Sequence, residues 1–162
     1  LLSAGKWIGV EGDRAETLFL EYQVQVPSSQ TYFFYARKFW QHGPFRWRWN
    51  DQPWQTVGDE VYLMDDPNIR EFVEANWVSL GKVKLPAGRH TLRIELTKKD
   101  GAAAFDCFAL TQAPFQPRGT LKPDQQHVAQ VQDGFIFNPP SDPFTQSPID
   151  LRNLNEAIAG EN

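Results

Sequence analysis

The sequence predicts an all-β protein, a β-sandwich or jelly roll with one short helix, and three observations favour this fold class. Apolar and polar residues alternate with period two in several segments, which is typical of half-buried strands. Clusters of Pro, Gly, Asn and Asp separate these segments. Only one short internal segment has a helical pattern, so the order of elements does not fit an alternating α/β fold.

The strands are expected at residues 18–26, 31–40, 45–49, 77–85, 90–97 and 103–111. The third of them alternates Phe45, Trp47 and Trp49 with Arg46 and Arg48. A turn centred on Pro, Ala and Gly at 86–88 predicts that the two strands flanking it form a hairpin. In the last strand, strict alternation predicts one face with Phe105 and Cys107, and an opposite face with Asp106, Phe108 and Leu110.

The short helix is expected just after residue 65. Asp66 can cap it, Pro67 suits its first position, and Ile69, Phe72 and Val73 give it an apolar side.

The chain is predicted to divide into a sandwich domain at 1–112 and a Pro-rich tail at 113–162. Most of the twelve prolines lie in this tail, and proline does not enter a central strand. We interpret the tail as an extended connector leading to a following domain. Its phenylalanines could dock it on the sandwich: Phe115, Phe135, Phe137 and Phe144. Residues 149–159 could add one or two amphipathic helical turns.

Composition excludes several classes of partner. Acidic and basic residues are mixed, with a formal charge of −4, so no basic tract favours nucleic acid. No apolar run is long enough to span a membrane. A single cysteine, Cys107, rules out an internal disulfide. The start at Leu1, without Met, leads us to expect a piece of a longer protein.

Three segments carry a family resemblance: YQVQVP at 22–27 followed by TYFFYAR at 31–37, VKLPAGRHTL at 83–92, and FDCFAL at 105–110. Together they resemble the galactose-binding-like jelly rolls, especially carbohydrate-binding modules of families 6 and 35. The segment at 150–161 is similar to stretches that precede glycoside hydrolase catalytic domains.

The resemblance implies a non-catalytic module of a secreted, cell-surface or periplasmic bacterial enzyme. Its partners would be a polysaccharide and the appended catalytic domain. A structural accessory domain that packs on a neighbouring catalytic domain, without a ligand of its own, is the alternative.

The candidate sugar-binding residues lie in one aromatic and basic segment: Arg37, Trp40, His42, Arg46, Arg48 and Trp54. Sugar C–H groups stack on aromatic faces, and sugar hydroxyls accept hydrogen bonds from guanidinium groups. Trp47 and Trp49 share one strand face and fit a core position. Arg46 and Arg48 fit a solvated face, cross-strand ion pairs or contacts to an anionic sugar. The loop at 98–104 lacks the aromatic residue that the related modules often carry there, which moves the expected site to residues 40–54.

A structural calcium is implied by the resemblance, held between the start of the domain and its last strand. Asp106 matches the family's last-strand Asp, and Glu11, with Asp13 nearby, loosely matches its N-terminal acidic segment. Oxygen ligands suit calcium. An ordinary hydrogen bond or ion pair at Asp106 is the alternative.

Catalytic motifs are absent from the sequence. The three histidines have no metal-binding spacing, and there is no nucleophile elbow or phosphate-binding loop. Cys107 falls in an apolar strand and is expected to be buried and unreactive.

Overall fold

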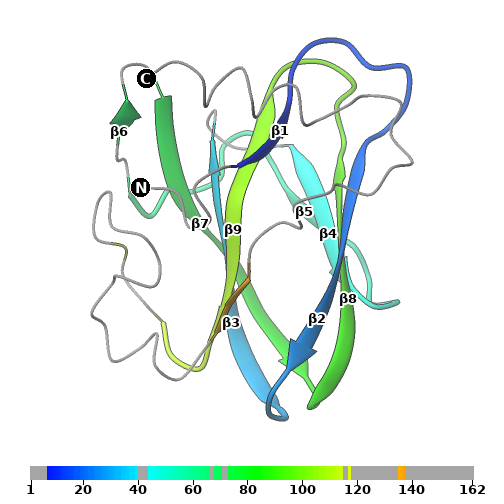
Figure 1. The fold of residues 1–162 in the computed structure, drawn as a ribbon, viewed down its shortest axis with the longest axis vertical. Coiled ribbons are helices and arrows are strands. Elements are labelled where there is room, and N and C mark those ends of the chain that lie inside the picture. Colours follow the sequence, from blue (N-terminus) through cyan, green and yellow to red (C-terminus); the bar gives the residue numbers. More distant parts are fainter. Residues whose placement is uncertain are drawn as a thin grey trace.

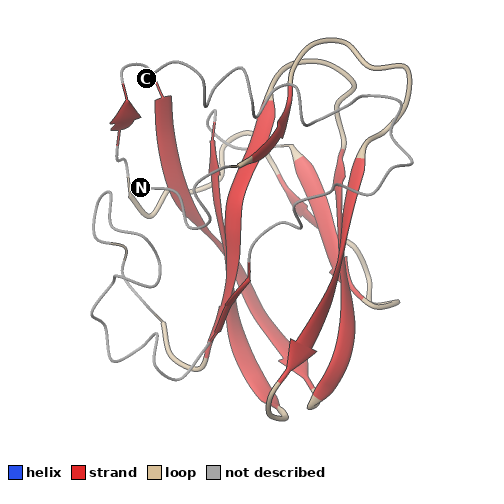
Figure 2. Ribbon diagram, viewed as in Figure 1, coloured by secondary structure: helices blue, strands red, loops and turns tan. Residues whose placement is uncertain are grey.

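The computed structural model describes residues 7–39, 44–65, 68–70, 73–114, 117 and 135–137. These residues form two antiparallel β-sheets that face each other, which confirms the predicted β-sandwich (Figure 1). Among them there are only strands, turns and loops (Figure 2).

Each sheet draws its strands from separate parts of the chain. Sheet A contains, in spatial order, β1 (Ile8–Val10), β9 (Ala103–Thr111), β3 (Gln30–Phe39), β7 (Val73–Leu85) and β6 (Asn68–Arg70), with β10 (Phe135–Phe137) paired to β9. Sheet B contains β2 (Phe19–Val26), β8 (Gly88–Leu96), β4 (Phe45–Trp49) and β5 (Gln55–Val57).

The predicted hairpin between β7 and β8 is wrong, because the chain changes sheets at this point. β7 pairs with β3 in sheet A, whereas β8 pairs with β2 and β4 in sheet B. Gly88 has a φ of 133°, which few other residues adopt, at the start of β8. The β2–β3 connection also crosses between the sheets, and its Ser29 Oγ accepts a 2.7 Å hydrogen bond from the Ala87 amide. The two crossings therefore lie side by side at one end of the sandwich.

The predicted helix is also not found where it was expected. Asn68–Arg70 form the short strand β6, and Val73 begins β7. Asp66, Pro67 and Phe72 lie outside the described residues. A proline in the first turn permits a helix but does not require one, and pairing with the long strand β7 sets the local conformation here.

The core between the sheets is built around Phe34 of β3. Its ring centroid lies 5.0 Å from that of Trp47 and 5.4 Å from that of Trp49, both in sheet B, and 6.1 Å from that of Phe108. Phe34 and Trp49 are fully buried and Trp47 is 5% exposed. This confirms the interpretation of the tryptophan pair of β4 as core.

Sheet A is apolar on its outer face as well. Two further clusters of buried residues lie there: Trp7, Phe39, Val73, Ala75 and Ala104 in one, and Tyr35, Trp77, Cys107 and Ala109 in the other. Strands buried on both faces read as near-continuous apolar runs, which explains why β3 and β9 depart from simple alternation.

A bulge in β9 changes which residues share a face. Arg37 pairs with Cys107 and Lys38 with Phe105, so Asp106 is an extra residue without an opposite partner in the ladder. Phe105 and Phe108 consequently both point into the inter-sheet core, with ring centroids 5.5 Å apart. The predicted division into faces, with Phe105 beside Cys107, is therefore wrong.

Two charged side chains of β3 are buried next to this bulge. Arg37 Nη1 donates to Asp106 Oδ2 at 3.2 Å, and both side chains are 0% exposed. Lys38 is 1% exposed, with its Nζ 5.7 Å from the ring centroid of Phe105 and 5.8 Å from that of Phe45. Burial lowers the pKa of Lys38 to about 7, although Asp59 opposes the shift.

Part of the predicted tail belongs to the fold. Phe135–Phe137 pair antiparallel with Phe108–Leu110 of β9. They lie on the same edge of β9 as β1, which pairs with residues 103–105. The docking that was expected through the tail phenylalanines therefore takes the form of a strand at this position.

Breaking the buried ion pair should cost much more stability than breaking an exposed one. Replacing Asp106 by Ala removes a carboxylate partner from the fully buried Arg37, and we expect the free energy of unfolding to fall by about 3 kcal/mol or more. Lys98→Gln breaks the Lys98–Asp59 pair, whose side chains are 54% and 57% exposed. This control should cost less than about 1 kcal/mol. Urea denaturation measures both, and similar small losses would contradict the assignment.

Stability should rise with pH above neutrality because of Lys38. The folded chain has a Lys38 pKa of about 7, against the ordinary lysine value of 10.5. Between these two values the amine is mostly deprotonated in the folded chain and protonated in the unfolded chain. The unfolded state then binds one more proton, so stability increases by up to about 1.4 kcal/mol per pH unit. Urea unfolding at about pH 7 and pH 9 measures this slope. Lys38→Met should flatten it, and an unchanged slope in that variant would assign the effect to another group.

Candidate functional site

The outer face of sheet B carries a grid of charged and aromatic side chains. The strand register places six of them in two neighbouring rows across β2, β8 and β4: Phe19, Glu95 and Arg46 in one row, and Glu21, Arg93 and Arg48 in the next. Apart from Glu95, these side chains are partly exposed, whereas the residues that alternate with them face the core.

Glu95 is the acceptor that connects the first row. Arg46 donates to its Oε2 from Nε at 2.8 Å and from Nη2 at 2.5 Å. Arg93 Nε donates to its Oε1 at 3.0 Å. Glu95 is 7% exposed, and its carboxylate is neutralised by two guanidinium groups. The expected cross-strand ion pair is confirmed for Arg46.

Arg93 has two further neighbours on β2. Its Nη1 lies 3.7 Å from Glu21 Oε2, and its guanidinium carbon lies 3.9 Å from the ring centroid of Phe19. A guanidinium over an aromatic face gains a cation–π interaction. Arg93 therefore has a salt bridge to each of the two carboxylates of the grid.

Trp54 extends the grid beyond β4. It follows the turn that joins β4 to β5, and the guanidinium carbons of Arg46 and Arg48 each lie 4.5 Å from its ring centroid. These contacts hold the indole in place without removing it from solvent, because the residue remains partly exposed. Trp54 is thus held by two arginines while part of the residue stays accessible to solvent.

The turn before Trp54 is fixed by Asn50 and His90. Asn50 has a φ of 50°, which asparagine tolerates better than most residues. Its Oδ1 accepts from the Thr91 amide and its Nδ2 donates to His90 Nδ1, both at 2.9 Å. His90 Nε2 in turn donates to the Pro86 carbonyl at 2.9 Å, which specifies the neutral tautomer protonated at Nε2. The Pro, Gly and His of the VKLPAGRHTL segment therefore serve the architecture rather than a ligand.

A groove lies on the other side of β5, between sheet B and β7. Its volume is about 300 Å³. It is lined by Trp47, Gln55, Thr56, Val57, Gly58, Glu60, Val61, Ser79 and Leu80. The mixture of polar and apolar side chains would suit a sugar, and Tyr62, which follows Val61 in the chain, is 80% exposed.

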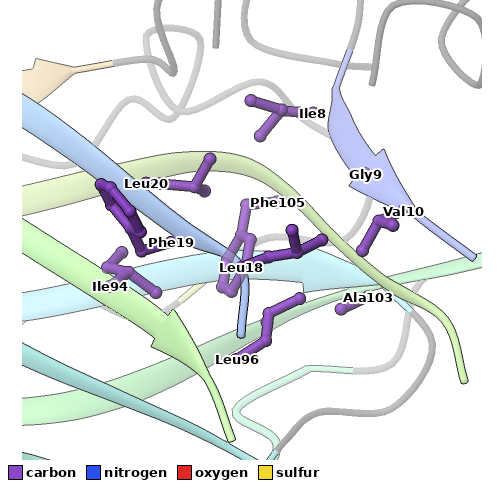
Figure 3. A pocket seen from close by; sticks show the side chains of 10 residues that line it. All are labelled: Ile8, Gly9, Val10, Leu18, Phe19, Leu20, Ile94, Leu96, Ala103 and Phe105. Atoms are coloured by element: carbon purple, nitrogen blue, oxygen red, sulfur yellow. The ribbon is translucent and has the colours of Figure 1, made fainter. Parts of the chain in front are cut away.

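A second cavity lies at the opposite edge of the sandwich and is small and apolar (Figure 3). It has a volume of about 30 Å³ and is lined by Ile8, Gly9, Val10, Leu18, Phe19, Leu20, Ile94, Leu96, Ala103 and Phe105. These side chains offer no hydrogen bond to a sugar hydroxyl. We interpret the cavity as a packing gap where the edges of the two sheets diverge.

The structure brings together half of the predicted sugar-binding residues. Arg46, Arg48 and Trp54 form one cluster on the outer face of sheet B. Arg37 is separate from them, because it is fully buried in sheet A. Trp40 and His42 lie outside the described residues.

The two predicted calcium ligands are not neighbours. Val10 pairs with Ala103, so the exposed Glu11 lies beyond that end of β9, four positions from Asp106 along the strand and roughly 13 Å away. Within the described parts of the chain no group of three or more metal-ligating side chains is found. Asp106 instead has Arg37 beside it, and a guanidinium disfavours a cation at the same carboxylate.

Sequence reasoning missed Glu95, Arg93, Glu21 and Phe19 as parts of the site. Each was visible as the polar or outward position of an alternating strand. Their proximity to Arg46 depends on the strand order β2-β8-β4, which the predicted β7–β8 hairpin obscured.

No protein-family model, curated protein or solved structure matches the chain. In the described ranges no helix meets the length and hydropathy needed to cross a membrane. Cys107 is fully buried in the cluster with Tyr35 and Trp77, in agreement with the expected core position.

Calcium binding through Glu11 and Asp106 stays a prediction, and a chelator tests it. A calcium ion bound only by the folded chain would stabilise it by mass action, so EDTA would lower the melting temperature and added calcium would restore it. The matched variant is Glu11→Gln, which should abolish the response to calcium. An identical melting curve with and without EDTA would mean that calcium does not contribute to the stability of the fold.

Proposed function

We propose that this chain is a non-catalytic carbohydrate-binding module of the jelly-roll type. In this proposal it holds an appended carbohydrate-active enzyme on a polysaccharide outside the bacterial cell. The ligand lies along the outer face of sheet B beside β5. The observation that carries the proposal is Trp54, a partly exposed indole held by two guanidinium groups at the end of a grid of hydrogen-bonding side chains.

The chemistry of this face matches the chemistry of a sugar. A pyranose ring presents C–H groups that pack on an indole, and its hydroxyl groups both donate and accept hydrogen bonds. Arg48 and Arg46 can donate to such hydroxyls, and Gln55 and Thr56 of β5 are exposed next to Trp54. A chain of sugar residues that crosses Trp54 would continue toward the groove behind β5, where Glu60 and Ser79 add polar groups.

The rigidity of the site also supports binding. Trp54 follows a turn that is fixed by Asn50, and Arg46 is fixed by two hydrogen bonds to Glu95. Because these side chains are ordered before a ligand arrives, binding loses little conformational entropy.

A structural accessory domain without a ligand is the alternative, and one observation favours it. Arg46 and Arg93 are already neutralised by Glu95 and Glu21, so most of the grid is stable by itself. In that case the outer face of sheet B would pack on a neighbouring catalytic domain or face solvent.

Trp54→Ala separates these two functions. We expect it to weaken retention on polysaccharide affinity gels by about tenfold or more, as is common for a tryptophan at the centre of a binding site. The melting temperature should stay within a few degrees of the wild-type value, because Trp54 lies outside the inter-sheet core. The matched control is Phe33→Ala, which removes a partly exposed aromatic ring of sheet A that lies 4.8 Å from Lys82 Nζ and should leave retention unchanged. Failure of the wild-type chain to bind any member of a broad glycan array would contradict the proposal and leave the accessory domain.

A further inference from the structure

The charges on the outer face of sheet B do not balance, and the imbalance is located at one residue. The grid contains three guanidinium groups, on Arg46, Arg48 and Arg93, against the two carboxylates of Glu21 and Glu95. Arg46 and Arg93 both bond Glu95, and Arg93 also lies near Glu21. The grid therefore has a net charge of +1, and the guanidinium group without a carboxylate partner is that of Arg48.

Arg48 has no carboxylate within salt-bridge distance in the described part of the chain. The guanidinium carbon of Arg48 lies 4.5 Å from the ring centroid of Trp54. The Nε of Arg48 is buried and has no hydrogen-bond partner among the described residues. The nearby Asp51 is exposed in the turn that follows β4 and forms no salt bridge with Arg48.

The position of Arg48 is unfavourable in the free protein. In the strand register it lies directly opposite Arg93, and like charges opposite each other destabilise a sheet. A donor without a partner adds to that cost. An anion next to Arg48 would offset the repulsion, because its negative charge would compensate the positive charge that faces Arg93.

We infer that Arg48 binds the acidic group of an anionic sugar residue whose ring lies against Trp54. The inference rests on the proposed function, and it names the class of ligand: a polysaccharide with carboxylate or sulfate groups. Since Arg48 Nε is buried, the anion meets the terminal nitrogens of the guanidinium, which can form two parallel hydrogen bonds to two oxygens of one acidic group.

A single anionic group per site fits this surface better than a polyphosphate backbone. Only one guanidinium of the grid is left without a carboxylate, and the whole chain has a formal charge of −4. Binding of a nucleic acid normally requires several phosphates to be neutralised together.

Two pairs of polymers that share a backbone but differ in charge test the inference. Dextran sulfate is compared with dextran, and polygalacturonate with its methyl ester, by affinity electrophoresis and titration calorimetry of the full chain. We expect the charged member of at least one pair to bind at least tenfold more tightly than its neutral partner. The pair that responds distinguishes a sulfate from a carboxylate.

Arg48→Gln should abolish this preference, so that the charged and the neutral member of the pair bind to this variant within about twofold of each other. Arg89→Gln is the matched control, because Arg89 is an exposed arginine of β8 in the same sheet, four positions from Arg93. It should keep at least half of the affinity for the charged polymer. If Arg48→Gln does not fold, Arg48→Lys preserves the charge and the aliphatic stem but removes the planar donor pair, and the preference should still fall severalfold.

The outcomes separate this inference from the proposed function. Equal binding of charged and neutral polymers, lost in Trp54→Ala, would support the module and overturn the role of Arg48. Equal losses in Arg48→Gln and Arg89→Gln would indicate diffuse attraction of a polyanion and would also overturn it. Retention of no polymer at all would overturn both proposals.

Discussion

The contact of Phe34 with the two tryptophans of β4 is the interaction on which the rest of the structure depends. It joins the centre of sheet A to the centre of sheet B, and Phe108 extends it toward β9. Large aromatic side chains bury more apolar surface than any others, so three of them at one crossing point fix the distance and the orientation of the sheets. The bulge at Asp106 serves the same core, because it turns both Phe105 and Phe108 inward.

The composition of the outer face follows from that core through the geometry of a strand. Side chains along β4 alternate between the two faces, so the inward Trp47 and Trp49 require that Arg46 and Arg48 point outward. The register with β8 then sets the neighbours of each arginine, Glu95 for Arg46 and Arg93 for Arg48. One strand thus determines both the packing of the sandwich and the charge pattern of its candidate binding face.

The sequence allowed the local features to be predicted and the long-range ones only in part. Period-two alternation located β2 and β4 and identified Trp47 and Trp49 as core, because these properties depend on neighbouring residues. The turn at residues 86–88 is compatible both with a hairpin and with a crossing between sheets. The long-range pairing of β7 with β3 and of β8 with β2 decides for the crossing. Long-range contacts also decide the role of Arg37, which was predicted to bind sugar because basic and aromatic residues surround it in the sequence. Its carboxylate partner is 69 residues away in the chain, and a bulge that no local pattern indicates brings the two together.

The strand formed by Phe135–Phe137 gives the tail a mechanical role. Since β10 is hydrogen-bonded along the edge of β9, a pull on the chain beyond residue 137 reaches the sandwich through this edge. Force directed along paired strands must shear several hydrogen bonds together, whereas force across them would open the bonds one by one. A chain cut at residue 112 would also leave the amides and carbonyls at Phe108–Leu110 available to an edge strand of another molecule, with the risk of aggregation that open edges bring. The part of the chain that must be kept together for a well-behaved fold therefore extends at least to Phe137.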